Sequence, residues 1–548
     1  MKKKLLAMLL TTAMAASLAV GCSTPKSSDS SDSKDSSNSD EKVFRYATNT
    51  EPTSLDPSKG QAIGDNEIQH AITEGLVRNT AGDIQPGLAE KWEVSDDGLT
   101  YTFHIREDAK WSDGEALTAN DFVYSWQRLV DPETASPYAF IGDYLKNGYA
   151  IETGTMDKSE LGVKAVDDQT LEVTLENPTP YFLSLIGSSG QYAPLRQDIV
   201  EKYGSDFAAT ADKNVYSGPF KLTSSENNEY IFEKNENYWD IDDINLDRVE
   251  LSYVEKPDTQ LAMYESGDLD YVQVPSAYVP DYKDKANEFM NGNVDFYYIN
   301  EKSDNPALSN KNFRLALNYA LDRNSYNELA NNGISTPVNG LVFPGLTEDG
   351  KTYGDNSKLK SYPLDGDKDK ANEYLKAAMS ELGVSKPSDI SVEITTTDAE
   401  SSKKIAEVTQ ELWQKALGIK VTIRQVTYAE IYGTVLPGGD YEIGYGGWGA
   451  DYDDPYSYLE LFKSDSSYNY SQYKNDEVDK LLAEAQTELD TTKRMEMLHQ
   501  IEQLLVDDGA FVPMQARNVY YMIDDDVKDV SFYFCSLNID WVHADIKK

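Results

Sequence analysis

Residues 101–130 read YTFHIREDAKWSDGEALTANDFVYSWQRLV and contain the signals of a strand, a turn and a helix in succession. The first five residues alternate apolar with polar side chains, which predicts a half-buried strand. A turn follows at residues 111–114 (WSDG). Thr118 and Asp121 then form an approximate capping box. They predict a helix over 119–130 whose apolar residues share one face: Phe122, Trp126 and Leu129.

Other elements extend outward from this unit. Residues 43–47 predict a strand, residues 67–76 a helix, and residues 166–175 a hairpin around Asp168 and Gln169. Strands are expected to dominate from there to about Val274. The second half alternates helical with strand periodicity, which predicts an α/β lobe with a largely open sheet. Its expected helices are 313–321, 368–382, 401–417, 476–489 and 493–506, and its expected strands are 392–395, 420–426 and 441–445.

The N-terminus has the pattern of a secreted lipoprotein. Three lysines, Lys2 to Lys4, precede an apolar run that is too short for a comfortable membrane span. Ala19-Val20-Gly21-Cys22 resembles a bacterial lipobox, so we expect residues 1–21 to be a lipoprotein signal peptide and Cys22 to carry the lipid. The alternative is an ordinary signal peptide with an incidental Cys22. Residues 22–42 are dominated by Ser, Asp, Lys and Asn, and are expected to form a disordered tether.

Composition excludes several classes of protein. With 548 residues the chain exceeds what a single core usually supports, so two or three lobes are expected. The formal charge of −44 repels phosphate backbones and excludes nucleic acid as a partner. The mature chain has Cys535 as its one cysteine besides Cys22, so no disulfide framework is expected, which favours a Gram-positive cell surface.

Several motifs together resemble one known family. They are residues 88–92 (LAEKW), 101–106, 109–114, 118–126, 217–220 (SGPF), 313–317 (FRLAL) and Gly447-Trp448. The chain is similar to the peptide, nickel and related solute-binding lipoproteins that deliver ligands to ABC importers, and most similar to their oligopeptide-binding branch. The resemblance spans residues 43 to 540.

The resemblance implies a three-lobe α/β protein of the periplasmic-binding-protein type, with two large lobes closing over a ligand. Lobe one would comprise residues 43–73, 197–295 and 517–548. Lobe two, the smaller one, would be 74–196, and lobe three 296–516. The implied partners are an oligopeptide and the permease subunits of an importer. The protein would be a monomer without a cofactor or metal, attached to the membrane through its lipid alone.

The resemblance also implies a peptide site. Asp451 matches the family aspartate that pairs with the α-ammonium group of the ligand, an interaction suited to a buried carboxylate. The strand before it is rich in glycine, and Gly447 and Gly449 would let the ligand backbone approach as an added strand. Aromatic residues match positions that line the cleft: Tyr138, Tyr428 and Trp448.

At the carboxyl end of the ligand the sequence departs from its enteric relatives. Tyr445 and Ser402 occupy positions where basic side chains can meet the peptide carboxylate. Gln61 replaces an acid at the edge of the cleft. Strict recognition of short peptides by their carboxylate is therefore not expected from these positions.

The sequence argues against two rival functions and leaves a third open. An exported lipoprotein hydrolase would need catalytic motifs, but the four histidines have no HExxH spacing, no GxSxG occurs, and Ser471 to Lys474 has SxxK form without its companion motifs. A calcium loop at residues 365–376 lacks the required glycine and glutamate, so a solvated helix start is the better interpretation. A receptor for signalling or cell-wall peptides would keep the same fold and site, and the sequence leaves it open.

Overall fold

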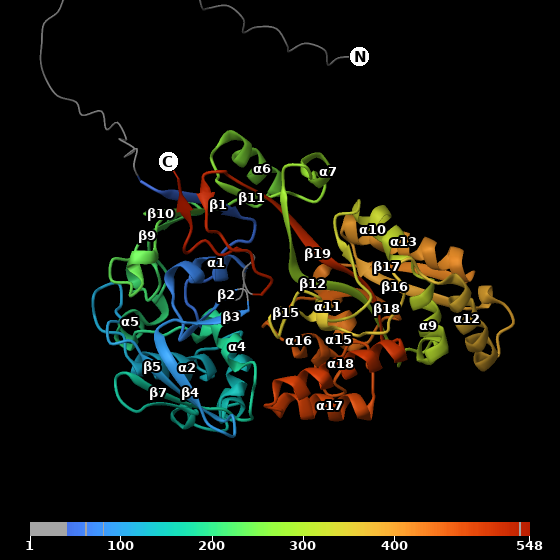
Figure 1. Ribbon diagram of the computed structural model, residues 1–548, viewed down its shortest axis with the longest axis horizontal. Coiled ribbons are helices and arrows are strands. Elements are labelled where there is room, and N and C mark those ends of the chain that lie inside the picture. Colours follow the sequence, from blue (N-terminus) through green and yellow to red (C-terminus); the bar gives the residue numbers. More distant parts are fainter. Residues whose placement is uncertain (1–40, 61–62, 81, 536–538, 548) are drawn as a thin grey trace, which may run out of the picture. The chain divides into compact units, whose positions relative to one another are not determined.

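The computed structural model describes residues 41–60, 63–80, 82–535 and 539–547. Residues 42–548 form one compact unit. The predicted signal peptide, Cys22 and Gln61 lie outside the described residues. Within the described part, two four-stranded sheets and one seven-stranded sheet carry the fold (Figure 1).

The first four-stranded sheet joins segments far apart in the chain. Its order is β1-β10-β9-β8, with β1 (Val43–Thr48), β10 (Arg248–Tyr253), β9 (Glu229–Lys234) and β8 (Phe220–Glu226). The Trp541 ring packs on Phe44 and Tyr46 of β1, so the C-terminal segment completes this core. Helix α1 (Ile63–Ile72) packs on this core, and β20 (Val527–Lys528) and β21 (Asp545–Ile546) pair in the C-terminal segment. Helix α5 (Gln197–Tyr203) packs in a small cluster of its own, whereas α6 (Pro257–Ser266) and α7 (Val279–Tyr282) pack against the seven-stranded sheet.

The second four-stranded sheet contains the opening stretch of the sequence. Its order is β4-β5-β7-β6, with β4 (Ala89–Val94), β5 (Thr100–Ile105), β7 (Thr170–Thr174) and β6 (Val163–Ala165). Helix α2 (Ala119–Val130) has the predicted bounds, and the Asp121 carboxylate accepts a hydrogen bond of 2.7 Å from the Thr118 N–H. The predicted hairpin forms as β6 and β7, but its first strand lies before Val166, where the prediction began. The nearby elements are β2 (Val77–Thr80), β3 (Asp83–Pro86), α3 (Gly148–Glu152) and α4 (Phe182–Ser188).

Two expectations for the first half were wrong. The helix predicted over 67–76 is α1, which ends at Ile72 because Gly75 and Leu76 lead into β2. Strands do not dominate up to Val274, since α4, α5 and α6 lie in that part of the chain. The short apolar run of α4 fits a helix as well as a strand, an ambiguity that periodicity alone does not resolve.

The seven-stranded sheet dominates the second half, and its main path is β11-β19-β12-β18-β16-β17, with β13 pairing β19. Its strands are β11 (Tyr271–Gln273), β19 (Phe511–Ile523), β12 (Asn287–Ile299), β18 (Ile443–Trp448), β16 (Ser391–Thr397), β17 (Lys420–Val426) and β13 (Thr336–Pro337). Figure 1 shows α9 (Lys311–Ala320), α10 (Arg323–Asn331), α12 (Lys368–Leu382) and α13 (Glu400–Leu417) grouped beside this sheet. The alternation of helix and strand predicted for this half is confirmed.

The remaining elements lie between these helices and strands. They are α8 (Pro306–Ser309), β14 (Thr347–Glu348), β15 (Lys351–Thr352), α11 (Tyr353–Asn356), α14 (Tyr428–Glu430), α15 (Leu436–Gly438), α16 (Tyr456–Leu459), α17 (Asp476–Thr487) and α18 (Thr491–Asp508). Asp367 caps α12 by accepting from the Lys370 N–H, so the acidic run before it is a helix start, as predicted.

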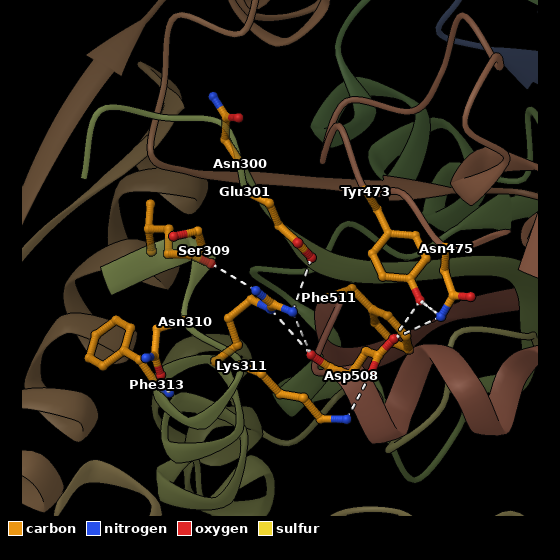
Figure 2. A network of polar contacts seen from close by, with 12 residues as sticks. Asn300, Glu301, Ser309, Asn310, Lys311, Phe313, Tyr473, Asn475, Asp508 and Phe511 are labelled. Carbon is orange, nitrogen blue, oxygen red and sulfur yellow. Dashed lines mark hydrogen bonds and ion pairs between the residues drawn. The ribbon is translucent and has the colours of Figure 1, made fainter. Parts of the chain in front are cut away.

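A polar network fixes the start of α9 against the end of α18 (Figure 2). The Asp508 carboxylate accepts hydrogen bonds from Lys311 at 2.8 Å and from the Tyr473 hydroxyl at 2.7 Å. Arg314 donates to the Asp508 carbonyl and forms an ion pair of 3.3 Å with Glu301. The network therefore joins the end of β12, two helices and the loop before α17.

The predicted boundaries between lobes one and three fall inside two long strands. Residues 295 and 296 lie within β12, and residues 516 and 517 lie within β19. These two strands pair with each other, so the chain passes between the two regions along adjacent strands. The division into three lobes stays a prediction.

Candidate functional site

Strand β18 has a free edge along its C-terminal part. It pairs with β12 from Ile443 to Trp448, but β16 pairs with it only at Ile443 and Gly444. The Asn300 N–H donates to the Glu442 carbonyl, so alternate residues from Glu442 onward point their backbone groups at β12. Tyr445 and Gly447 therefore point theirs to the other side, where no strand within the described residues pairs with them.

The glycines of this strand serve the packing of the protein itself. A Cβ on Gly447 would lie 2.7 Å from the Asp295 Oδ1 atom, and one on Gly449 would lie 2.9 Å from the Asn293 Oδ1 atom. The corresponding atoms for Gly444 and Gly446 belong to Leu436 and Tyr298. The space of the missing side chains is therefore filled by the protein itself. The approach of a ligand backbone to these glycines stays a prediction.

Asp451 follows β18 in a loop held by Ser457. The Ser457 hydroxyl accepts from the Asp451 N–H at 3.3 Å and from the Trp448 indole N–H at 3.4 Å. The Asp451 side chain stays accessible to water, and no ion pair to it is found in the described part of the chain. Burial among surrounding residues raises its pKa to about 6, because much of the water that stabilises a carboxylate is displaced. This carboxylate therefore lacks a cation.

Aromatic residues from two regions surround Asp451. Burial raises the pKa of Tyr138 and Tyr468, and the nearby Asp451 charge raises both further. The Trp448 ring contacts the Tyr468 ring at 5.0 Å. The structure thus brings three predicted site residues together, Tyr138, Trp448 and Asp451, and adds Tyr468, which no sequence signal had marked.

The other predicted residues lie elsewhere. The Tyr445 side chain is 8% exposed and its ring packs on Tyr297 at 5.3 Å, so only its backbone reaches the free edge. Tyr428 is 72% exposed and contacts the Tyr432 ring. Ser402 lies in the first turn of α13.

The loop that carries Asp451 contacts two regions of the chain, residues 181–184 and helix α18. The Asp453 N–H donates to the Ser184 hydroxyl of α4 at 3.1 Å. The Tyr181 and Tyr452 rings stack at 4.5 Å. A buried ion pair between Arg494 and Asp454 lies against the Tyr181 ring. These contacts attach the loop to α4, to Tyr181 just before it, and to α18.

Glu460 is a second carboxylate near Asp451. Burial raises its pKa to about 8, and the Tyr452 hydroxyl lies 3.2 Å from its Oε1 atom. Since the folded protein holds this proton to a higher pH than the unfolded chain, stability should fall as pH rises from about 4.5 to 8.

Glu460→Gln should remove this part of the pH dependence, because an amide keeps the acceptor but has no charge. We expect the variant to gain about 1 to 2 kcal/mol over wild type between pH 5 and pH 8. Urea denaturation at a series of pH values measures this. A stability difference that stays constant over this range would contradict the assignment.

A cavity of about 150 Å³ lies apart from this site, lined by residues of α1, β2, α4 and residues 531–543. Its charged groups pair with one another, as His70 does with Asp540 at 2.9 Å and Arg78 with Glu74 at 2.7 Å. None of the predicted site residues that the structure describes lines it. We assign it no ligand.

Residues 83–500 match the family model of the bacterial extracellular solute-binding proteins, family 5 middle. The chain belongs to this family. The oligopeptide-binding protein OppA of Bacillus subtilis (strain 168) is 34% identical over 490 residues, which are 88% of each chain. Two solved structures, OppA of Listeria monocytogenes bound to peptide and the pheromone receptor PrgZ, are each 32% identical with a TM-score of 0.71. Both matches cover 93% of this chain and 100% of the other.

Membership of family 5 confirms two predictions, the solute-binding family and its mixed α/β fold. It also places the chain among binding proteins rather than enzymes. None of the helices in the described ranges is both long and apolar enough to span a bilayer. In the same ranges, no group of three or more His, Cys, Asp or Glu side chains is arranged to hold a metal.

Proposed function

We propose that this family 5 protein is a lipid-anchored, extracytoplasmic receptor that captures oligopeptides and delivers them to an ABC importer. The free edge of β18 leads directly to Asp451, whose carboxylate pairs with no cation among the described residues, and this arrangement is the observation that carries the proposal. A peptide can add to this edge as a strand, because backbone hydrogen bonds do not depend on its sequence. The names of the relatives support a peptide as the ligand.

Asp451 would bind the α-ammonium group at the first residue of the peptide. The cation would stabilise the charged form of a carboxylate whose pKa is raised by its surroundings, and the bond would be charge-assisted. Tyr138, Tyr468 and Trp448 would pack on the first residues of the ligand with flat faces that suit many side chains.

Removing either charge should weaken binding strongly. We expect N-acetylation of a peptide to reduce the affinity of wild type by about 2 kcal/mol or more, and Asp451→Asn to abolish most of this discrimination. Affinity for free peptides should also fall below about pH 6, where Asp451 takes up a proton. Isothermal titration calorimetry measures all three effects.

Asp465→Asn provides the matched control, since that carboxylate is 75% exposed and pairs with Lys463. It should leave the discrimination and its pH dependence unchanged. Equal affinity of wild type for free and acetylated peptides would refute the role of Asp451.

The anchor is tested separately through the two cysteines. Cys22→Ala should release the protein from the membrane fraction or leave it unprocessed, because a single lipidated cysteine is the proposed attachment. Cys535→Ala is the control, since Cys535 is buried in the fold. Membrane association of Cys22→Ala at the wild-type level, measured by cell fractionation and immunoblotting, would disprove the anchor.

The similarity to the pheromone receptor PrgZ favours a second role, reception of signalling or cell-wall peptides at the same site. The chemistry at Asp451 serves both roles equally. Mass spectrometry of the ligand that co-purifies from native cells distinguishes them, since import of nutrients predicts a mixture of peptides and signalling predicts one sequence.

A further inference from the structure

We propose that Arg517 forms an anion subsite beside the free edge of β18 and binds a carboxylate group of the ligand. The inference rests on the proposed peptide function and concerns the opposite end of the site from Asp451. Arg517 is a residue of β19, beyond the predicted end of lobe three, and no motif in the sequence marked it.

The Arg517 side chain is fixed by a buried carboxylate. Its Nε atom donates to Asp295 at 2.9 Å, and its Nη2 atom lies 2.7 Å from the Asp295 Oδ1 atom. Asp295 is 1% exposed and also accepts from Gln515 at 2.9 Å. The guanidinium plane is therefore held in place before any ligand arrives, which reduces the entropy lost on binding.

One part of the guanidinium group has no partner. The Nη1 atom makes no hydrogen bond within the described residues, and the Arg517 side chain is 50% exposed, whereas that of Asp295 is 2% exposed. The N–H donors of Nη1 are thus free to bind a ligand. The charge of the group is neutralised by Asp295, which contacts its Nε and Nη2 atoms. Such donors suit a carboxylate, because the bond is charge-assisted.

Gly447 brings this pair close to the strand that has the free edge, although Asp295 and Arg517 belong to β12 and β19 on its other side. Asp295 pairs with Gly447 across β12 and β18, and its Oδ1 atom fills the space of the missing side chain. The backbone of the same glycine faces the free edge. Tyr445 and Tyr432 also lie close to Arg517, since its positive charge opposes the rise of both pKa values that burial causes. Arg517 therefore lies next to the backbone that a bound peptide would pair with.

The spacing along β18 determines which carboxylate of a ligand can reach Arg517. Gly447 and Asp451 are four residues apart, which corresponds to at most about 13 Å of extended chain. A peptide of three or four residues with its ammonium group at Asp451 would bring its terminal carboxylate to Arg517. A longer peptide could place an acidic side chain there. Both sources present the same group, and the experiment separates them.

Calorimetry with two pairs of peptides tests the proposal. The first pair is tetra-alanine as free acid and as amide, and the second is an amidated hexapeptide with Glu or Gln at position four. Wild type should prefer the carboxylate member of at least one pair by about tenfold or more, the range of a buried charged contact. A preference within the first pair identifies the terminal carboxylate as the source, and one within the second identifies the side chain.

Arg517→Gln should reduce that preference to less than about twofold, while affinity for the uncharged member changes little. Because this variant leaves Asp295 buried without a cation, Asp295→Asn combined with Arg517→Gln is tested beside it. Arg424→Gln is the control, since Arg424 pairs with the exposed Asp440 in the same region. Arg424→Gln should keep the wild-type preference.

Two results would overturn the subsite. One is wild type binding both members of each pair equally, and the other is a preference that survives in the double variant. If wild type bound none of the four peptides, the proposed peptide function itself would fail. The acetylation experiment at Asp451 decides that question independently.

Discussion

Replacing Arg494 with methionine is expected to lower the free energy of unfolding by about 3 to 5 kcal/mol. Its guanidinium group forms a bidentate ion pair with Asp454 at 2.5 and 2.8 Å, and donates to the Ala485 carbonyl at 2.9 Å. Both residues are buried. The large effect arises because the substitution leaves the Asp454 carboxylate buried without a cation.

Urea denaturation of Arg494→Met measures this loss. The double variant Arg494→Met with Asp454→Leu is the control, because removing both charges of a buried pair is often nearly neutral. It should recover most of the stability. If the double variant were as unstable as the single one, lost packing against Tyr181, rather than the orphaned charge, would explain the effect.

Local elements of the fold were predictable because their signals are local. Helix α2 has the predicted bounds, since the capping residues Thr118 and Asp121 and the apolar face all lie within one short stretch. Helix α12 and strand β17 likewise have the predicted bounds. Short apolar runs such as α4 were misjudged, because a few buried residues fit a helix and a strand equally well.

A motif marks part of the candidate site in the sequence. Trp448 and Asp451 follow a glycine-rich strand, and the structure places Tyr138 near Asp451, but their role in binding stays a prediction. Arg517 could not be found, because its place beside Gly447 depends on the pairing of β12 with both β18 and β19. Tyr445 was predicted to lie at the ligand, but its ring is buried in the core. Successive side chains of a strand point to opposite faces, so a single position decides which face a ring occupies.

Arg323→Met should lower the free energy of unfolding by about 3 kcal/mol or more, for a different reason from Arg494→Met. Arg323 is 0% exposed, and burial lowers its pKa to about 10. Its donors bond the carbonyls of Pro513 at 2.7 Å and Asn318 at 3.2 Å.

No carboxylate pairs with Arg323 in the described part of the chain, so the substitution leaves no buried carboxylate without a cation. The loss comes from buried carbonyls that are left without donors. Arg323→Lys should not restore stability, because a single ammonium group cannot donate to the Pro513 and Asn318 carbonyls in the geometry of the planar guanidinium group. Chemical denaturation of both variants beside Arg424→Met, which should change stability by less than about 0.5 kcal/mol, provides the comparison. A lysine variant as stable as wild type would show that the positive charge, and not the geometry of its donors, matters at this position.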